Sequence, residues 1–471
     1  MLSVLTQPRC AVAIFLYLSI FITGAEAADA TSLAQGALAQ ASGSETTPRV
    51  LQLAAGYSAF ANFEARFSSW RGSRGTNVFD PTPGKGNQFY VPMTFGLDYE
   101  SAGNYRLQTR VKTGYVNSNN QTPGQVASLS TMVDTQVTTT LTYLAAESYR
   151  AFVGIAMNAP TGTTYLPNNL RFTRMDPDLV DIGSYGAGWN FNPTAGVIFA
   201  VDQNTAVSLS AGYAWQGPFN REGVNTANIS TCFPPTVPLQ CYPGLGPTFD
   251  ASQRIDPGDV FTANANTSTI LGKLAVKTSF AFMSEGDVKL NGIAVGRTGA
   301  KFVTNAEANY QINPRLGISV NGSYTYTQKN KIVGPLGGLI TEPKDSNGDV
   351  AIGSVGPTYA LSERLNVGVN YSVLWRRHNY YDFIENEYIP AKLKQSVGGI
   401  LNYATSPTSS IGIRSSYFWV NEYTGPLLPI AFNCDPNPFS CNPNHVDARA
   451  SVPPALHYTG WTAVLTGNIR F

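Results

Sequence analysis

Apolar and polar residues alternate with a period of two in the last part of the chain. Counting back from Phe471, every second residue as far as Trp461 is apolar or small, and the residues between them are mostly polar. This period is typical of a β-strand whose two faces meet different surroundings. Four further segments share the pattern: residues 89–99, 207–215, 316–326 and 365–375. Aromatic residues concentrate near the ends of these segments, which favours strands that cross a membrane and meet its two interfaces there.

The connections between the predicted strands alternate in length. Short turns fall at residues 101–104, 145–148, 202–204, 272–273, 313–314, 361–363 and 405–407. Longer connections lie between them, at residues 68–87, 118–130, 159–188, 217–257, 286–299, 328–347, 377–393 and 422–455. Bacterial outer-membrane barrels have such tight periplasmic turns and long outer loops.

The pattern therefore predicts an all-β fold, a transmembrane antiparallel outer-membrane β-barrel of about sixteen strands with long extracellular loops, over residues 49–471. An even number of strands places both chain ends in the periplasm. The first strand, Val50 to Phe67, is rich in Ala and could instead be helical or lie inside the barrel, which would leave about fourteen strands. A soluble β-sandwich or propeller is the alternative fold, but it would not alternate its loop lengths in this way.

Composition favours a membrane barrel over a soluble enzyme. Charged residues make up 13% of the chain, against about 25% in soluble domains, and aromatic residues make up 11%. The mean hydropathy is −0.09, as expected where lumen-facing residues dilute the apolar ones. A net charge of +1 gives no electrostatic basis for binding nucleic acid.

The first residues resemble an export signal. Arg9 precedes an apolar run from Ala11 to Ile22, and residues 25–27 (Ala-Glu-Ala) form a small-x-small cleavage site. We therefore predict a signal peptide over residues 1–27. An N-terminal membrane anchor is the alternative, but the run is shorter than the ~20 residues that a spanning helix needs. Residues 28–48 are small and polar, and predict a flexible periplasmic or lumenal tail.

Export and a barrel fold imply particular partners, namely outer-membrane lipid and the barrel-assembly machinery. Trp461 and Phe471 form the predicted C-terminal assembly signal, and Phe471 closes the last strand. Arg376 and Arg377 follow Trp375 at a strand end, where they could anchor at the lipid headgroups.

Four cysteines follow the predicted signal peptide, in two close pairs within Pro-rich connections: Cys232, Cys241, Cys434 and Cys441. In an oxidising compartment each pair could form a local disulfide. Four cysteines allow three pairings, so the connectivity stays open. A zinc site is the rival interpretation, but the spacings differ from those of the common zinc fingers.

The polar faces of three predicted strands carry basic residues: Arg106, Arg110, Lys112, Lys277 and Arg414. A charge that faces lipid near the midplane costs about 2–4 kcal/mol, so these side chains are expected to face the lumen. Our hypothesis is a lumenal basic ladder that favours anionic solutes. The alternative is a structural network in which they pair with lumenal carboxylates, such as Asp98 on the neighbouring strand.

Residues that would indicate catalysis or cofactor binding are scarce. The three histidines, His378, His445 and His457, fall in predicted outer loops or at the start of the last strand. No phosphate-binding Gly-rich loop and no metal-type pair of histidines occurs. Residues 345–349 have alternating oxygen ligands, as in calcium loops, but lack the closing acidic residue, so a turn is the favoured interpretation. We expect no enzyme and no cofactor, with a barrel hydrolase as the alternative.

Residues 87 to 220 resemble a known family in the order of their elements. Val133-Asp134-Thr135 leads into a strand, residues 153–162 end a second strand in Pro-Thr-Gly, and a long loop precedes the returning strand that contains Trp189. This order is similar to that of outer-membrane transporter families associated with phenol-degradation pathways, which are related to the long-chain fatty-acid (FadL-like) transporters. The resemblance implies passive uptake of small aromatic or hydrophobic compounds. It does not extend to the N-terminal hatch of the fatty-acid transporters, because the tail here is shorter and lacks their Asn-Pro.

Three functions follow from these observations. The first is an outer-membrane channel or transporter for passive uptake of small organic solutes. The second is a general diffusion porin, which should show a long loop folded into the barrel, with residues 217–257 as the candidate. The third is a surface adhesin or structural barrel whose loops, constrained by the predicted disulfides, bind a partner.

Overall fold

The computed structural model describes nine stretches of the chain: residues 56–73, 83–101, 104–122, 125–144, 149–222, 252–334, 337–381, 388–423 and 455–471. The predicted signal peptide, the predicted tail and the four cysteines of the predicted disulfides lie outside these residues. Within the described stretches, no helix is both long enough and apolar enough to span a membrane.

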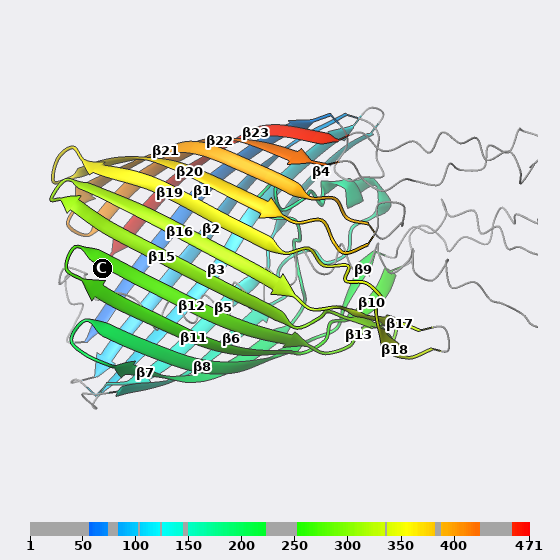
Figure 1. The fold of residues 1–471 in the computed structure, drawn as a ribbon, viewed down its shortest axis with the longest axis horizontal. Helices are drawn as coiled ribbons and strands as arrows, with labels where there is room; N and C mark the ends of the chain where they lie inside the picture. Colours follow the sequence, from blue (N-terminus) through cyan, green and yellow to red (C-terminus); the bar gives the residue numbers. More distant parts are fainter. Residues whose placement is uncertain are drawn as a thin grey trace, which may run out of the picture.

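The wall of the molecule is one antiparallel sheet that closes on itself (Figure 1). Its strands are β1 (Tyr57–Gly72), β2 (Gly84–Ser101), β3 (Tyr105–Thr122), β4 (Gln125–Met132), β5 (Thr135–Tyr143), β6 (Tyr149–Ala159), β7 (Asn190–Ala200), β8 (Thr205–Gln216), β11 (Val260–Leu271), β12 (Leu274–Glu285), β15 (Lys301–Asn313), β16 (Leu316–Thr327), β19 (Val350–Ala360), β20 (Leu365–Arg376), β21 (Lys392–Ser406), β22 (Ser409–Glu422) and β23 (Leu456–Arg470). β4 and β5 lie end to end beside β3, so the 17 strands described form a closed barrel of 16 positions. The predicted fold class is confirmed.

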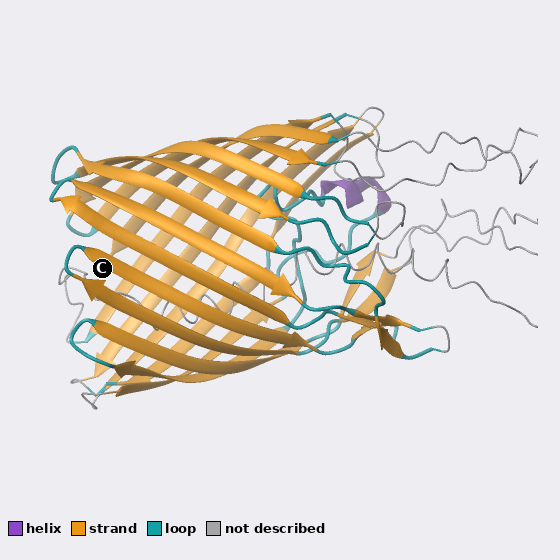
Figure 2. Ribbon diagram, viewed as in Figure 1, coloured by secondary structure: helices purple, strands orange, loops and turns teal. Residues whose placement is uncertain are grey.

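A second, smaller sheet, which we call the outer sheet, stands at the end of the barrel where the long connections lie (Figure 1). It contains β9 (Phe219–Glu222), β10 (Ser252–Asp256), β13 (Val288–Leu290), β14 (Ile293–Arg297), β17 (Lys331–Val333) and β18 (Leu339–Thr341). A short 3-10 helix, η1 (Asn168–Thr173), lies at the same end of the barrel (Figure 2). The short turns occupy the opposite end, together with the C-terminus (Figure 1).

The alternation of the sequence matches the two faces of the wall. On β23, Trp461, Leu465 and Ile469 are 46%, 47% and 39% exposed, as are comparable apolar residues on the outer face of the other strands. An apolar surface of this extent is stable only in contact with lipid, because water contact costs about 25 cal/mol per Å². The outer face is therefore the lipid face, and the polar residues between these positions face the lumen.

The closing seam joins the two ends of the sheet. β1 and β23 pair from Phe60 opposite Arg470 to Gly72 opposite Tyr458. Phe471 continues the ladder, since its N–H donates to the Ala59 carbonyl (2.8 Å) and its carbonyl accepts from the Ala59 N–H (3.2 Å). The first strand is thus a wall strand that begins at Tyr57 and ends at Gly72, and the helical alternative for residues 50–67 is wrong over the described part.

One predicted long connection is wrong. Residues 118–130 belong almost entirely to β3 and β4, which pair as far as Thr122 opposite Gln125. The strands continue because polar side chains pair across them, as in the hydrogen bond from Asn117 to Ser130 (2.6 Å). The connection predicted at residues 68–87 is also shorter, because β1 reaches Gly72 and β2 begins at Gly84.

Aromatic rings on the inner face lie over glycines of adjacent strands. Phe60 of β1 lies over Gly96 of β2, where an added Cβ would clash with the ring. The arrangement recurs with Phe152 over Gly196 and Phe418 over Gly460. The missing side chain lets each ring lie flat along the wall, which keeps the lumen wider than a projecting ring would allow.

Candidate functional site

The connection between β6 and β7, residues 160–189, folds inward across the mouth of the barrel, and we call it the inner strap. Apolar residues of the strap and of the inner wall form two buried clusters. The first contains Trp70, Met175, Leu179, Val180, Phe418, Val420, Leu456 and Tyr458. The second contains Tyr90, Val116, Leu166 and Tyr185. The strap therefore packs against the inner faces of β1 to β3 and of β22 to β23, near their long-loop ends.

An ion cluster around a buried lysine ties the strap to β21. The Lys392 ammonium is 4% exposed and lies 2.8 Å from an Asp176 carboxylate oxygen and 2.9 Å from one of Asp178. Lys394 donates to the Asp178 backbone carbonyl. Burial disfavours the charged carboxylate of Asp176, but the adjacent Lys392 charge and its hydrogen bond outweigh this effect, so the pKa of Asp176 is lowered. Breaking a fully buried pair costs about 3–5 kcal/mol, and the cost here is lower because Asp176 and Asp178 are 27% and 24% exposed.

Gln88 of β2 holds the next part of the strap. Its amide nitrogen donates to the Ile182 carbonyl (2.7 Å), and its amide oxygen accepts from the Ile182 N–H (2.8 Å). The same nitrogen also donates to the Ser118 hydroxyl (2.8 Å). Nearby, Arg66 lies 3.4 Å from Asp181 of the strap and contacts Glu64 on its own strand. These contacts hold residues 181–182 of the strap against β1 and β2.

Asp134 holds together the two ends of the strap, which we call its neck. This residue lies in the break between β4 and β5, and its carboxylate accepts from the backbone N–H of Gly162 (2.8 Å) and of Ala187 (2.7 Å). The Asn158 side chain donates to the same carboxylate (2.7 Å). At this neck a Cβ on Gly162 would clash with the Tyr185 carbonyl. One side chain therefore fixes both ends of the strap.

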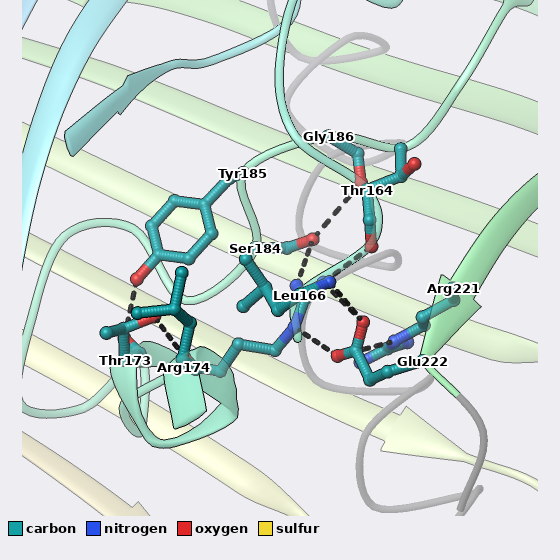
Figure 3. A network of polar contacts seen from close by, with 10 residues as sticks. Thr164, Leu166, Thr173, Arg174, Ser184, Tyr185, Gly186, Arg221 and Glu222 are labelled. Carbon is teal, nitrogen blue, oxygen red and sulfur yellow. Dashed lines mark hydrogen bonds and ion pairs between the residues drawn. The ribbon is translucent and has the colours of Figure 1, made fainter. Parts of the chain in front are cut away.

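A second ion pair joins the strap to the outer sheet (Figure 3). The Arg174 Nε lies 2.7 Å from Glu222 of β9, and its Nη2 donates to the Thr164 carbonyl (2.8 Å). Glu222 also accepts from the Leu166 N–H (3.2 Å). Desolvation by burial opposes the charge on Glu222, but the Arg174 guanidinium more than compensates, so the pKa of Glu222 is lowered. The strap and the outer sheet are thus coupled through charged groups.

The sequence does not identify the strap as the inward-folded loop. Residues 217–257 were the predicted candidate, but residues 223–251 lie outside the described part, and the flanking β9 and β10 pair in the outer sheet. The connection at 159–188 was predicted only as a long loop. Its run of acidic residues, with Asp176, Asp178 and Asp181, was the one available signal of basic partners.

The predicted basic ladder occupies inward-facing positions on β3, β12 and β22, so the structure does not bring its five members together. Arg106 lies 2.9 Å from Glu100 of β2. Arg110 lies 2.5 Å from Asp98 of β2, the carboxylate that the alternative interpretation named, and over the ring of Phe60 (4.4 Å).

The other members of the ladder differ from these two. Lys112, Lys277 and Arg414 form no ion pair within the described residues. Lys277 lies opposite Glu307 of β15 in the register. Lys112 and Arg414 are exposed on the inner wall.

The remaining predicted residues lie on the lipid face, on the inner wall and in a turn. Trp461 is on the lipid face, with its ring 4.9 Å from that of Phe67. Arg376 does not reach the headgroups, because it faces inward and lies 2.8 Å from Glu422. Asp345 forms a turn by accepting from the Asn347 N–H (2.9 Å). Over the described stretches, no group of three or more His, Cys, Asp and Glu residues could hold a metal ion.

Comparisons with known proteins give weak resemblances. No protein family and no curated protein matches the sequence. A solved outer-membrane channel from Pseudomonas putida F1 is 12% identical, covers 60% of this chain and 93% of its own, and has a TM-score of 0.35. The P. putida toluene transporter TodX is 9% identical, with coverages of 88% and 90% and a TM-score of 0.35. Acinetobacter baumannii OccAB4 is 6% identical, with coverages of 88% and 98% and a TM-score of 0.40.

Because these similarities are low, the class of the protein is inferred from its own geometry. A closed antiparallel wall, an apolar outer face and a polar inner face define a membrane-spanning β-barrel of the outer-membrane type.

Proposed function

We propose that the protein is a passive channel of the bacterial outer membrane that admits small organic solutes. The observation that carries the proposal is the inner strap, a loop that narrows the mouth of a closed barrel while remaining part of the same chain. A barrel that served only as a structural support would have no need of a loop tied to both the wall and its own neck. The strap limits the size of solutes, and the lumen wall below it selects among them.

The solutes that we propose are small aromatic or hydrophobic compounds, including anionic ones. The family resemblance of residues 87–220 supports the aromatic class. The lumen offers matching chemistry, because Phe60 lies flat on the wall with the Arg110 guanidinium over its ring. Lys112 and Arg414 supply exposed positive charge on the same inner wall. No chemical reaction and no cofactor enters this function.

A general diffusion porin is the second candidate, and one observation favours it. The inner strap is a long loop folded into the mouth, which is the feature that the porin hypothesis requires. The two candidates differ in selectivity. A porin passes small hydrophilic solutes according to size, whereas the proposed channel prefers aromatic over equally small polar solutes.

The test is solute uptake by proteoliposomes that contain the refolded full-length chain. Benzoate, an uncharged aromatic alcohol and a pentose of similar size are compared in a swelling assay. Uptake of both aromatic solutes at least severalfold faster than of the pentose supports the proposal. Equal rates support the porin, and no uptake by correctly folded barrels contradicts both and favours the adhesin or structural barrel.

A further inference from the structure

Two positively charged residues lie opposite each other on the lipid side of the wall. Arg71 of β1 and Lys85 of β2 are register partners. Both are exposed, whereas their chain neighbours Trp70 and Gly86 are buried on the inner side. The strict alternation of β1 and β2 therefore points Arg71 and Lys85 outward, at the end of the barrel that carries the long loops.

The height of this pair along the wall is fixed by the aromatic residues beneath it. Phe89 and Tyr115 are outward-facing and 39% and 38% exposed, and the ring of Phe67 contacts that of Trp461. Such rings mark the interface between hydrocarbon and headgroups. Arg71 lies four residues beyond Phe67, and Lys85 lies four residues before Phe89, so both lie two outward positions beyond this girdle, at the level of the headgroups.

Carboxamides and hydroxyls continue the outward surface beside the pair. The Asn119 amide donates to Asn87 (3.0 Å) and to Asn117 (2.8 Å), and Asn117 donates to Ser130 (2.6 Å). These side chains form a row across β2, β3 and β4, above the same girdle. The row holds the amides in place with further donors and acceptors available, as binding of sugar hydroxyls requires.

The charges of Arg71 and Lys85 are not balanced within the part of the chain that the structure describes. Neither side chain forms an ion pair or a hydrogen bond to a described residue. Like charges directly opposite each other on one face of a sheet destabilise it. An anion that bridges the two side chains would remove this repulsion, and a phosphate can do so because a guanidinium binds it through paired hydrogen bonds.

We propose that Arg71, Lys85 and the adjacent row of amides bind the phosphorylated sugar headgroup of a glycolipid in the outer leaflet. The two cations hold the phosphate, the amides hold the sugar hydroxyls, and the aromatic girdle contacts the upper part of the acyl chains. This site rests on the proposed placement in the outer membrane, but not on conduction of solutes. It is separate from the lumen and from the inner strap.

The experiment compares wild type with the double variant R71Q/K85Q, as full-length refolded barrels in detergent. The probe is bis-phosphorylated lipid A, and binding is followed by native mass spectrometry and by the temperature of unfolding. The control variant R315Q/R364Q removes two exposed charges from the turns at the opposite end of the same barrel. Solute uptake by each variant is measured in parallel, which separates failure of this site from failure of the proposed channel.

We expect wild type and R315Q/R364Q to bind lipid A equally, and R71Q/K85Q to bind on the order of tenfold more weakly. Without lipid, R71Q/K85Q should unfold at the same or a higher temperature than wild type, because the repulsion is gone. With lipid A, only wild type and the control should gain stability. Equal binding by R71Q/K85Q, or equal binding of fully dephosphorylated lipid A, would overturn the proposal. Displacement of lipid A by millimolar inorganic phosphate would overturn the assignment to a lipid.

Discussion

Asp134 accepts a hydrogen bond from the backbone of Ala187 at 2.7 Å, although 53 positions separate the two residues. The same carboxylate accepts from Gly162 at the other end of the inner strap. The break between β4 and β5 thus positions the Asp134 carboxylate at the neck of the inner strap, where it binds both ends of the loop.

Asp134→Asn should loosen the inner strap without unfolding the wall. The amide retains one acceptor oxygen but places an NH₂ group against backbone donors, and each lost hydrogen bond to a charged group costs about 1.5–3 kcal/mol. We expect more open-state noise and a higher mean single-channel conductance. Asp202→Asn is the matched control, because Asp202 accepts from the Asn204 N–H in a turn at the opposite end and from no other residue that the structure describes. Equal traces for both variants and wild type would exclude a role for the neck.

Lys392→Met should release the strap from β21. The change leaves the carboxylates of Asp176 and Asp178, which are 27% and 24% exposed, without their cation, at a local cost below the about 3–5 kcal/mol of a fully buried pair. Trypsin should then cleave the strap at Arg171 or Arg174 faster than in wild type, as judged by mass spectrometry of the fragments. Protection equal to that of wild type would show that the apolar clusters alone hold the strap.

The same ion cluster predicts how the strap responds to acid. The pKa of Asp176 is lowered in the folded protein, below the ordinary value of 3.8. A group with a lowered pKa contributes stability above its unfolded pKa and loses it as the pH falls through the folded one. Conductance should therefore stay constant from neutral pH down to about 4 and rise only below it. In Lys392→Met this acid step should be absent, and a step that persists there would assign it to other carboxylates.

Gly96→Val should narrow the lumen. Its side chain would clash with Phe60, which would turn away from the wall and project inward. Overpacking of this kind costs about 1–3 kcal/mol, which a large barrel tolerates. Conductance should fall, and the double variant F60A/G96V should restore it. Gly399→Ala, where a Cβ would have ordinary contact distances, is the control. A normal conductance in Gly96→Val would mean that the ring does not reach the permeation path.

Lumenal charge should set ion selectivity in a way that separates the two interpretations of the basic residues. K112Q/R414Q removes two exposed charges and should lower the anion-to-cation permeability ratio without loss of thermal stability. R106Q/R110Q also leaves Asp98 and Glu100 unpaired, so it should lower the ratio and destabilise the barrel slightly, by about 0.2–1 kcal/mol per pair. Reversal potentials in a salt gradient measure the ratio. An unchanged ratio in both variants would rule out the basic ladder.

The wall could be predicted from the sequence because its signal is local. Lipid forces every second residue to be apolar, and β23 shows this from Trp461 to Ile469 without any distant information. The alternation of apolar and polar residues is lost where a strand extends beyond the hydrocarbon region of the membrane. Asn117 and Asn119 face outward there and are polar, so the alternation vanished and residues 118–130 were interpreted as a loop.

The inner strap could not be predicted because its determinants are distant in the sequence. Lys392 and Asp176 are 216 positions apart, and nothing near either residue identifies the other. The ladder lies between these cases. The period of two places Arg110 on the same face as Asp98 of the neighbouring strand, so their contact could be predicted from the sequence. The distance between Lys277 and Arg414 could not, because it depends on how the sheet closes.

The most direct test of the account is the single-channel conductance of the refolded wild-type protein in a planar bilayer, recorded beside Asp134→Asn. We predict a small, steady conductance for wild type and a clearly larger one for the variant, because the inner strap narrows the lumen in wild type. A large ohmic conductance that is identical in both proteins would show that the strap does not narrow the path. Zero conductance in both, from correctly folded barrels, would contradict the channel itself.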